Sequence, residues 1–444
     1  MRSHGAASDA PVFLAAGIAP QGRFTRVKFI LPAVLLAWSG VVFWNLAKPL
    51  PPGTHIVSQV SRLSEADIEF LYESPRHRGV AGRDLSAVDH AEQLIVVDRS
   101  PLTPELAQRL LERKRLRPHL KVLLVTDPRS ETFGGTPPRT LTSLEEAGII
   151  VARVRLERLR DSNPLYTGFW RLAFAWWSDP ADDNWGSDHR QFVVADDGSG
   201  GWTAVLSSAG SAAGLILRGS LARAMIAGEL KIAAWSTDDD RLPAEPPMSG
   251  VGVGSIDARF LTEGAIESAL LDAVGATGAG DQIGIAVHTL SARRVIGAVL
   301  RAAARGARLQ VILGRNAIPN RAVAAELLRE GSGRIDVRWY AGGGAASHPE
   351  LLVVRHAADV WMNMGSANFT RRDLGDLNLD AGVELRMPAR TAPARAVGGY
   401  FAALWSDASA DADFPDDSQL AYWRYRIAEA TGLSSFLNRG RDAP

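Results

Sequence analysis

Short apolar runs alternate with segments of helical periodicity along the first half of the chain. Runs such as Leu94–Val97 contain only apolar residues, which is typical of strands that are buried on both faces. Thr103 followed by Pro104 predicts the capped start of a helix between two such runs. The predicted strands cover 94–97, 121–127 and 149–154, and the predicted helices cover 104–116 and 141–148. Strands that alternate with helices indicate βαβ units and predict a mostly parallel sheet.

The same alternation recurs in the second half of the chain. Predicted strands cover 283–287, 309–313 and 335–340, and predicted helices cover 291–306 and 321–331. Residues 240–255 between the two series are rich in proline and glycine, which predicts a linker. We therefore expect an α/β protein with two copies of one lobe, at 48–239 and 256–444, each a mostly parallel sheet flanked by helices.

An uncharged apolar run near the N-terminus is long enough to span a bilayer. It covers residues 29–47, and Arg23, Arg26 and Lys28 precede it. Basic residues on the N-terminal side favour a cytoplasmic tail at 1–28, so we expect the lobes on the extracytoplasmic side of the membrane. A cleaved signal peptide is the alternative, although no Ala-x-Ala site follows the run. The sequence therefore predicts a single-pass membrane protein.

Composition narrows the classes of partner. The 444 residues contain 49 Lys plus Arg and 49 Asp plus Glu, so the formal net charge is zero. A nucleic-acid-binding chain usually shows a basic surplus, so we expect no nucleic-acid partner. The chain has no cysteine, which excludes disulfides, thiol catalysis and cysteine-ligated metal.

Two histidines lie at matching places in the two lobes. His189 precedes Ser208 by 19 residues, and His348 precedes Ser366 by 18. Each interval fits a strand, a turn and a second strand that ends in a turn of small residues. Together with the repeated lobe plan, this spacing indicates a duplicated site.

The segments that carry this spacing, HRQFVVAD at 189–196 and GSANFTRRDLGDLNLD at 365–380, resemble the phospholipase D superfamily. The family pattern is His-x-Lys, then Asp, then Gly-Ser-x-Asn, once per lobe. Within the superfamily the chain is similar to a bacterial membrane-anchored branch with cardiolipin-synthase and phosphatidyltransferase relatives. The resemblance implies a cleft between two lobes, a phospholipid or other phosphodiester as substrate, a phosphohistidine intermediate, and no cofactor or metal.

The resemblance also implies roles for particular residues. Two imidazoles that face each other across a phosphodiester can act as nucleophile and general acid. The implied catalytic residues are His189 and His348. The implied substrate-binding residues are Ser208, Ser366, Asn368, Arg371 and Arg372, and the implied supporting residues are Asp196 and Asp380.

The chain departs from the pattern where the family has its lysines. Gln191 and Glu350 occupy the two lysine positions, Gly210 replaces the first asparagine, and Arg355 replaces the second aspartate. Removing one preorganised donor to a developing anion costs about 10²- to 10³-fold in rate, and a carboxylate in its place adds repulsion.

A nearby arginine is a possible replacement for the lost cations. Arg190 and Arg355 stand at odd offsets from the histidines and would face away on a continuous strand, so Arg371 and Arg372 are the better candidates. We expect a catalytically impaired relative of a phospholipid phosphodiesterase or phosphatidyltransferase. A still-active enzyme that uses His189 and His348 is the alternative, and a nuclease fits the neutral charge and the anchor poorly.

Overall fold

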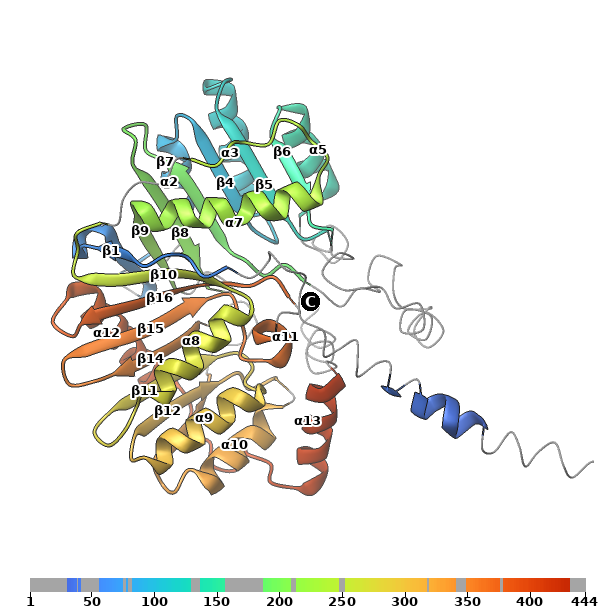
Figure 1. The fold of residues 1–444 in the computed structure, drawn as a ribbon, viewed down its shortest axis with the longest axis vertical. Coiled ribbons are helices and arrows are strands. Elements are labelled where there is room, and N and C mark those ends of the chain that lie inside the picture. The colour runs from blue at the N-terminus through green and yellow to red at the C-terminus, as the bar shows by residue number, and fades with distance from the viewer. Residues whose placement is uncertain are drawn as a thin grey trace, which may run out of the picture.

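A computed structural model gives the fold of most of the chain. It describes residues 30–37, 39–40, 56–74, 77–78, 82–128, 136–155, 187–208, 213–246, 252–317, 319–340, 349–375 and 378–431. Figure 1 shows two lobes, one above the other, each built around a twisted sheet with helices against it.

Both sheets have eight strands in the same spatial order. The first sheet runs β3 (His77–Arg78), β2 (Ile68–Ser74), β9 (Ala213–Arg218), β8 (Trp202–Ser207), β7 (Phe192–Asp196), β4 (Leu94–Asp98), β5 (Lys121–Thr126) and β6 (Ile150–Arg153). The second runs β1 (Ser61–Leu63), β10 (Ile256–Thr262), β16 (Ala381–Pro388), β15 (Asp359–Gly365), β14 (Glu350–Arg355), β11 (Gln282–Val287), β12 (Arg308–Leu313) and β13 (Ile335–Trp339). Seven strands of each sheet match place by place, as the predicted duplication expects, whereas the outermost strands β3 and β1 occupy different places in chain order.

The prediction of mostly parallel sheets is wrong, because both sheets are mixed. Only β4, β5 and β6, and their counterparts β11, β12 and β13, pair in parallel. The other neighbours, including the series β7–β8–β9 and β14–β15–β16, pair antiparallel. Parallel pairing needs a long crossover between strands, whereas β7–β8, β8–β9 and β14–β15 are joined by short turns; the longer connection 366–380 also returns antiparallel.

Helices cover both sheets on both faces. The outer face of the first sheet carries α2 (Arg83–His90), α3 (Pro104–Leu116) and α5 (Pro138–Glu146). The outer face of the second carries α8 (Gly264–Gly275), α9 (Arg293–Ala304), α10 (Asn320–Glu330) and α13 (Gln419–Thr431). A short helix, α11 (Arg371–Leu374), precedes β16, and a 3-10 turn covers Glu65–Asp67. Between the sheets lie α7 (Ser220–Ser236) and α12 (Ala392–Asp407).

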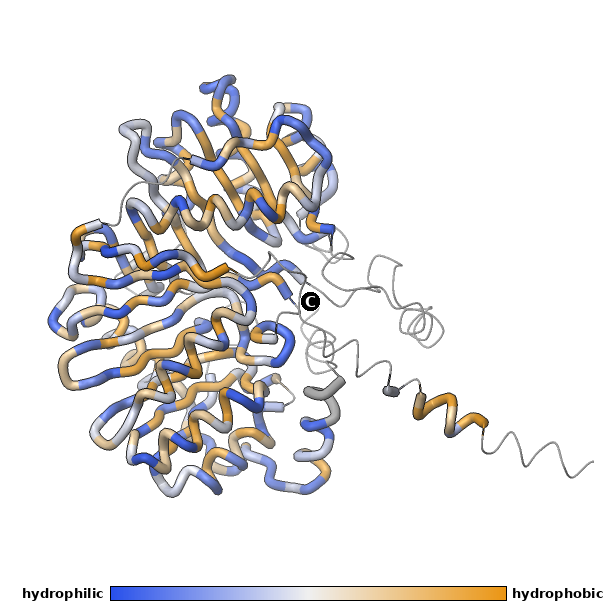
Figure 2. Tube along the Cα trace, viewed as in Figure 1, coloured by the Kyte–Doolittle hydropathy of each residue, from blue (hydrophilic) through white to orange (hydrophobic). Residues whose placement is uncertain are grey.

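One apolar core joins the two lobes. It contains Phe192 of the first sheet and Phe260 of the second, whose rings meet edge to face with centroids 6.0 Å apart. Helix α7 packs on β8 of the first sheet and also on β10 of the second, while α12 packs on β2. Figure 2 shows apolar strands inside and polar residues on the outer helices. Because the core is shared, the strands that approach the lobe boundary are held in fixed relation.

The N-terminal part of the described chain does not follow the lobe order. Strand β1 lies within the residues predicted for the first lobe, yet it pairs with β10 in the second sheet. Residues 30–37 and 39–40, inside the predicted anchor, are helical. In the described ranges, no helix combines the length and apolar character that crossing a bilayer requires. The rest of the run 29–47 lies outside the described residues, so the anchor stays a prediction.

Candidate active site at the lobe boundary

The segment that carries His189, just before β7, is joined to the second lobe by backbone hydrogen bonds. His189 N–H donates to the Leu379 carbonyl at 2.9 Å, and Leu379 N–H donates to the Ser187 carbonyl at 2.8 Å. Asp188 and Leu379 form a parallel bridge. The segment before β7 therefore lies beside the segment before β16, and His189 is held at the boundary between the lobes.

Two carboxylates of the second lobe face His189. Its Nδ1 lies 3.6 Å from Asp373 Oδ1 and 3.7 Å from Asp380 Oδ1. The histidine side chain is 30% exposed, whereas both carboxylates are buried. The structure therefore brings the predicted residues His189 and Asp380 together and adds Asp373, which the sequence analysis missed.

Hydrogen bonds fix the orientation of both carboxylates. Ser366 Oγ donates to Asp380 Oδ1 at 2.9 Å. Thr370 Oγ1 donates to Asp373 Oδ2 at 2.9 Å, and the Asn378 amide donates to Asp373 Oδ1. The second oxygen of Asp380, Oδ2, is buried and has no hydrogen-bond partner. Ser366 thus holds a carboxylate in the site, in addition to the substrate contact that the family resemblance implies.

Burial changes the proton affinity of these carboxylates. Loss of solvent raises the pKa of Asp380 to about 8, although the Ser366 hydroxyl, Arg190 and Arg372 oppose the shift. Burial, with help from the neighbouring Asp380, raises the pKa of Asp373 to about 6, while His189 opposes it. The two groups therefore compete for charge, as paired carboxylates do.

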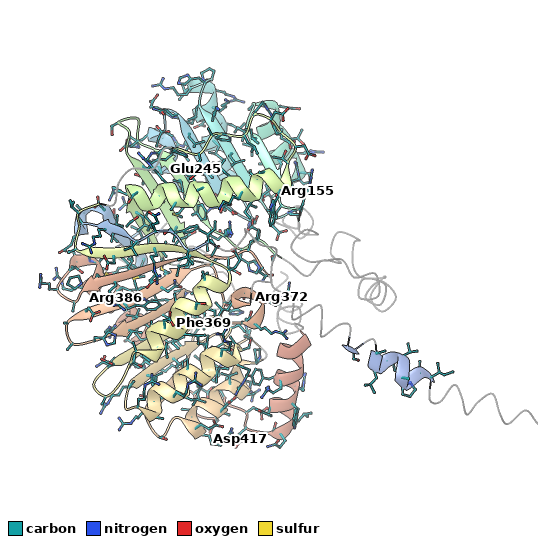
Figure 3. All side chains as sticks on the ribbon, in the orientation of Figure 1. Arg155, Glu245, Phe369, Arg372, Arg386 and Asp417 are labelled. Atoms are coloured by element: carbon teal, nitrogen blue, oxygen red, sulfur yellow. The ribbon has the colours of Figure 1, made fainter. Side chains whose placement is uncertain are left out.

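The two predicted substrate-binding arginines lie on α11, whose first turn is capped by Thr370. Figure 3 shows Arg372 on the part of the second lobe near the first. Arg372 is buried and donates from Nη2 to Asn378 Oδ1 at 3.2 Å. Arg371 beside it is partly exposed. Of the four arginines considered as replacements for the lysines, Arg190 and Arg372 both act electrostatically on Asp380, and Arg372 lies on α11 beside it.

Arg190 is held in a buried ion-pair network. Its Nη1 lies 2.7 Å from Glu229 Oε1 on α7, and its Nη2 lies 2.6 Å from Glu263 Oε1. All three side chains are fully buried. Asp98 and Asp188 interact electrostatically with Arg190, and burial raises the pKa of both. Arg190 therefore joins the two lobes through buried ion pairs.

The residues at the two lysine positions are also engaged or buried. Gln191 donates from Nε2 to the Ser100 carbonyl at 2.7 Å and accepts from Arg99 Nη1 at 3.4 Å. Arg99 is itself paired with Asp84 at 2.6 Å. Glu350 opens β14 opposite Gly365 and is 2% exposed. Arg99 was not predicted from the sequence, although Asp98 and Arg99, two charged residues at the end of the buried strand β4, were a visible signal.

The other predicted site residues have hydrogen-bond partners in the structure or lie outside the described residues. Asp196, at the opposite end of β7 from His189, accepts hydrogen bonds from the backbone of Glu92, Gln93, Leu94 and Gly198. Ser208 donates to the Ala213 carbonyl at 3.1 Å, and Asn368 Oδ1 accepts from Thr289 N–H at 3.2 Å. Arg355, the remaining arginine candidate, donates to the Gly398 carbonyl and lies over the ring of Phe401. His348 lies outside the described residues.

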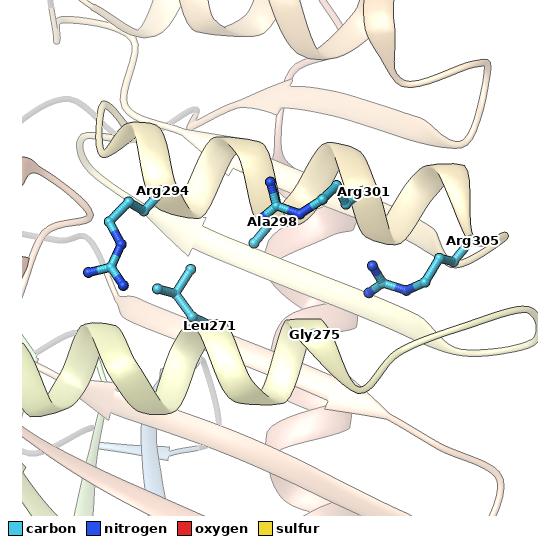
Figure 4. A pocket seen from close by; sticks show the side chains of 6 residues that line it. All are labelled: Leu271, Gly275, Arg294, Ala298, Arg301 and Arg305. Atoms are coloured by element: carbon cyan, nitrogen blue, oxygen red, sulfur yellow. The ribbon is translucent and has the colours of Figure 1, made fainter.

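A basic groove lies on the outer helices of the second lobe, between α8 and α9. It has a volume of about 270 Å³ and is lined by Leu271, Gly275, Arg294, Ala298, Arg301 and Arg305 (Figure 4). Arg294 is paired with Glu267, and Arg305 donates to the carbonyls of Val274 and Thr277. These helices cover the face of the second sheet that is turned away from the first, so the groove is separate from His189.

Comparisons with known proteins agree with the two-lobed fold. Residues 276–405 match the family described as cardiolipin synthase, phospholipase D-like domain. The crystal structure of phosphatidylserine synthase from Haemophilus influenzae Rd KW20 is similar, with a TM-score of 0.55 and 12% identity, covering 89% of this chain and 98% of that one. A phospholipase D family member, Nuc, from Salmonella typhimurium covers 34% of this chain and 96% of its own, with 17% identity and a TM-score of 0.28.

None of the curated proteins matches the chain. The match over 276–405 includes the Gly-Ser-Ala-Asn turn and Asp380, which hold one side of the site. The full-length structural likeness extends the same fold to the first lobe. Residues 276–405 thus match the phospholipase D-like domain of the cardiolipin synthase family, and the chain as a whole shares the fold of the phosphatidylserine synthase.

Proposed function

We propose that this protein is a membrane-anchored phospholipase D-superfamily protein whose phosphodiester-cleaving activity is impaired. The observation that carries the proposal is the state of the two lysine positions. Gln191 is bound to the Ser100 carbonyl, and Glu350 is a buried acid at the start of β14. Phosphodiester cleavage develops negative charge that cationic donors must stabilise, and here one position is neutral and the other acidic. Losing both donors lowers the rate of phosphodiester cleavage.

The ligand class follows from the relatives. The matched family is named for cardiolipin synthase, and the similar full-length structure is a phosphatidylserine synthase. We therefore propose a phospholipid or another phosphodiester as the molecule that the cleft binds. The apolar run 29–47 would hold the lobes at the extracytoplasmic membrane surface, where such lipids are available.

A still-active enzyme is the second candidate, and one observation favours it. The buried carboxylate of Asp380 is oriented by Ser366 and faces one imidazole nitrogen of His189, as a carboxylate that orients a catalytic imidazole does. In that case Arg372, which acts electrostatically on Asp380, would take over the charge stabilisation that the lysines supply in the family.

Turnover of a chromogenic phosphodiester and of a phospholipid panel by the detergent-solubilised full chain separates the two candidates. The proposal expects no turnover by the wild type and measurable turnover by the Gln191→Lys/Glu350→Lys variant. Because a lysine at the buried position 350 could hinder folding, Gln191→Lys/Glu350→Gln is measured beside it. Wild-type turnover that disappears in His189→Ala and persists in the control His356→Ala would refute the proposal and support the active enzyme.

The anchor is tested separately from the chemistry. We expect the full chain to stay in the membrane fraction after alkaline carbonate extraction, and a chain that lacks residues 1–47 to be released. A protease added outside the cytoplasmic membrane should cut the lobes while the N-terminal tail is protected. Release of the full chain by carbonate would refute the anchor.

A further inference from the structure

Three arginines of α9 line the basic groove between α8 and α9. Arg294, Arg301 and Arg305 are spaced by seven and four residues, which places them along one side of the helix. Figure 4 shows them across from Leu271 and Gly275 of α8. Guanidinium groups in a row attract anions, and their planar donor pairs match the oxygens of a phosphate. We propose that the basic groove binds a phosphate ester, at a site separate from His189.

The charges at the groove leave a positive surplus. Arg294 pairs with Glu267. Arg305 donates to backbone carbonyls, and Arg301 makes no ion pair or side-chain hydrogen bond within the part of the chain that the structure describes. Asp272 of α8 is exposed and does not line the groove. Three guanidinium groups thus face one carboxylate, and a bound anion would relieve the repulsion among them.

The end of α8 does not oppose an anion, because its carbonyl groups are occupied. Helix C-termini have partial negative charge, and α8 ends at Gly275 beside the groove. Arg305 donates from Nε to the Thr277 carbonyl at 2.7 Å and from Nη2 to the Val274 carbonyl at 2.8 Å. Arg301, in the last turn of α9, offsets the same partial charge on that helix. The positive side chains therefore determine the sign of the groove.

Small residues give the groove its room. Gly275 lines it from α8, where an added Cβ would meet nothing within 4 Å, and Ala298 lines it from α9. A Cβ at Gly297 would lie 3.1 Å from Arg301 Nη1, so the glycine leaves space for the guanidinium along the helix surface. Leu271 adds an apolar contact. The groove thus fits a phosphate with a short carbon group beside it.

The inference goes beyond the proposed function. The groove lies on the face of the second sheet that is turned away from the first, so binding there does not depend on the residues at the two lysine positions. A phosphate ester can come from a phospholipid headgroup or from a soluble molecule such as glycerol 3-phosphate. Both present the same oxygens to the arginines, and the experiment separates them.

Calorimetric titration of the detergent-solubilised full chain tests the groove. The ligands are glycerol 3-phosphate and short-chain phosphatidylglycerol, with glycerol as the phosphate-free control. We expect binding of a phosphate ester by the wild type, weakened at least ~10-fold in Arg301→Gln and in Gly275→Leu. Arg301→Gln removes one exposed charge, whereas Gly275→Leu keeps every charge and fills the groove. Tighter binding of phosphatidylglycerol identifies the lipid as the source, and tighter binding of glycerol 3-phosphate identifies the soluble ester.

Arg329 on α10 provides a matched control. It is an exposed arginine, paired with Glu330, that does not line the groove. Arg329→Gln and His189→Ala should keep the binding at the groove. Wild type that binds neither ester, groove variants that bind like wild type, or equal weakening in Arg329→Gln would overturn the inference. Binding lost in His189→Ala but kept in Arg301→Gln would place the ester at the lobe boundary, which overturns this inference and supports the ligand of the proposed function.

Discussion

One loop differs between the two lobes in both length and content. In the first lobe β8 and β9 are joined by residues 208–212, and in the second the equivalent strands β15 and β16 are joined by 366–380. The short loop contains Ser208, which bonds to the backbone across the turn. The long loop contains α11, both carboxylates that face His189, and the donors that orient them. Equal sheets thus present unequal loops, and the long loop of the second lobe supplies the carboxylates that face His189 of the first.

This difference shows where a duplicated fold diverges. The sheets must keep their register, because they share one core with α7 and α12. A loop at the end of two strands can lengthen or shorten with little cost in closure entropy. Chemistry carried by such loops is therefore lost or gained in one copy while the scaffold of both copies stays intact.

The largest expected effect comes from breaking the buried network that ties the lobes together. Arg190→Met leaves Glu229 and Glu263 buried without their cation, and we expect a loss of about 3–5 kcal/mol in the free energy of unfolding. Urea denaturation measures it. Arg153→Ala, which removes an exposed pair with Glu145, should cost about 1 kcal/mol or less. Equal losses in the two variants would contradict the structural role of the network.

The long loop should make stability depend on pH. Asp380 has its pKa raised to about 8, so the folded state holds a proton that the unfolded chain releases near pH 3.8. Stability is therefore present at low pH and lost as pH rises toward 8, with a slope of about 1.4 kcal/mol per pH unit for one proton. Asp380→Asn should flatten the decline. Denaturation between pH 5 and 8.5 that shows the same decline in both proteins would disprove the assignment.

The serines at the start of the two loops allow a direct comparison. Ser366→Ala removes a hydrogen bond to a buried carboxylate, so we expect a loss of about 1.5–3 kcal/mol. Ser208→Ala removes bonds to backbone groups, with an expected loss of about 1 kcal/mol. Chemical denaturation at one pH compares them. A larger loss for Ser208→Ala would indicate that the short loop carries the greater strain.

The smallest expected effect concerns two helix caps. Thr370 caps α11 in the long loop, and Thr103 caps α3 in the first lobe. Each change to alanine should cost about 1 kcal/mol of stability. Urea denaturation of the two variants compares the two losses. A loss near zero in either variant would mean that its threonine does not stabilise the helix start.

Much of the scaffold could be predicted from the sequence. Apolar runs such as Leu94–Val97 determine strands locally, and Thr103 with Pro104 determines a helix start, so the lobes and most elements were predictable. His189, Ser366 and Asp380 were found by their place in the family pattern. The partners of strands are not local, which explains why the mixed sheets and the position of β1 were missed. Asp373 lies in the segment 365–380 that carries the family resemblance, but its approach to His189 depends on the pairing of Asp188 with Leu379 across the lobes.

The position of β1 has a consequence for the order in which the protein can fold. Leu63 pairs with Ile256, so the first described strand waits for a partner that is made 193 residues later. Contacts with such long sequence separation slow folding, because the chain must close a large loop before it gains them. During synthesis the first sheet can assemble while β1 is still an exposed edge. A ribosome-bound chain that ends before β10 should therefore attract chaperones at residues 56–63, and release from them should follow completion of the second sheet.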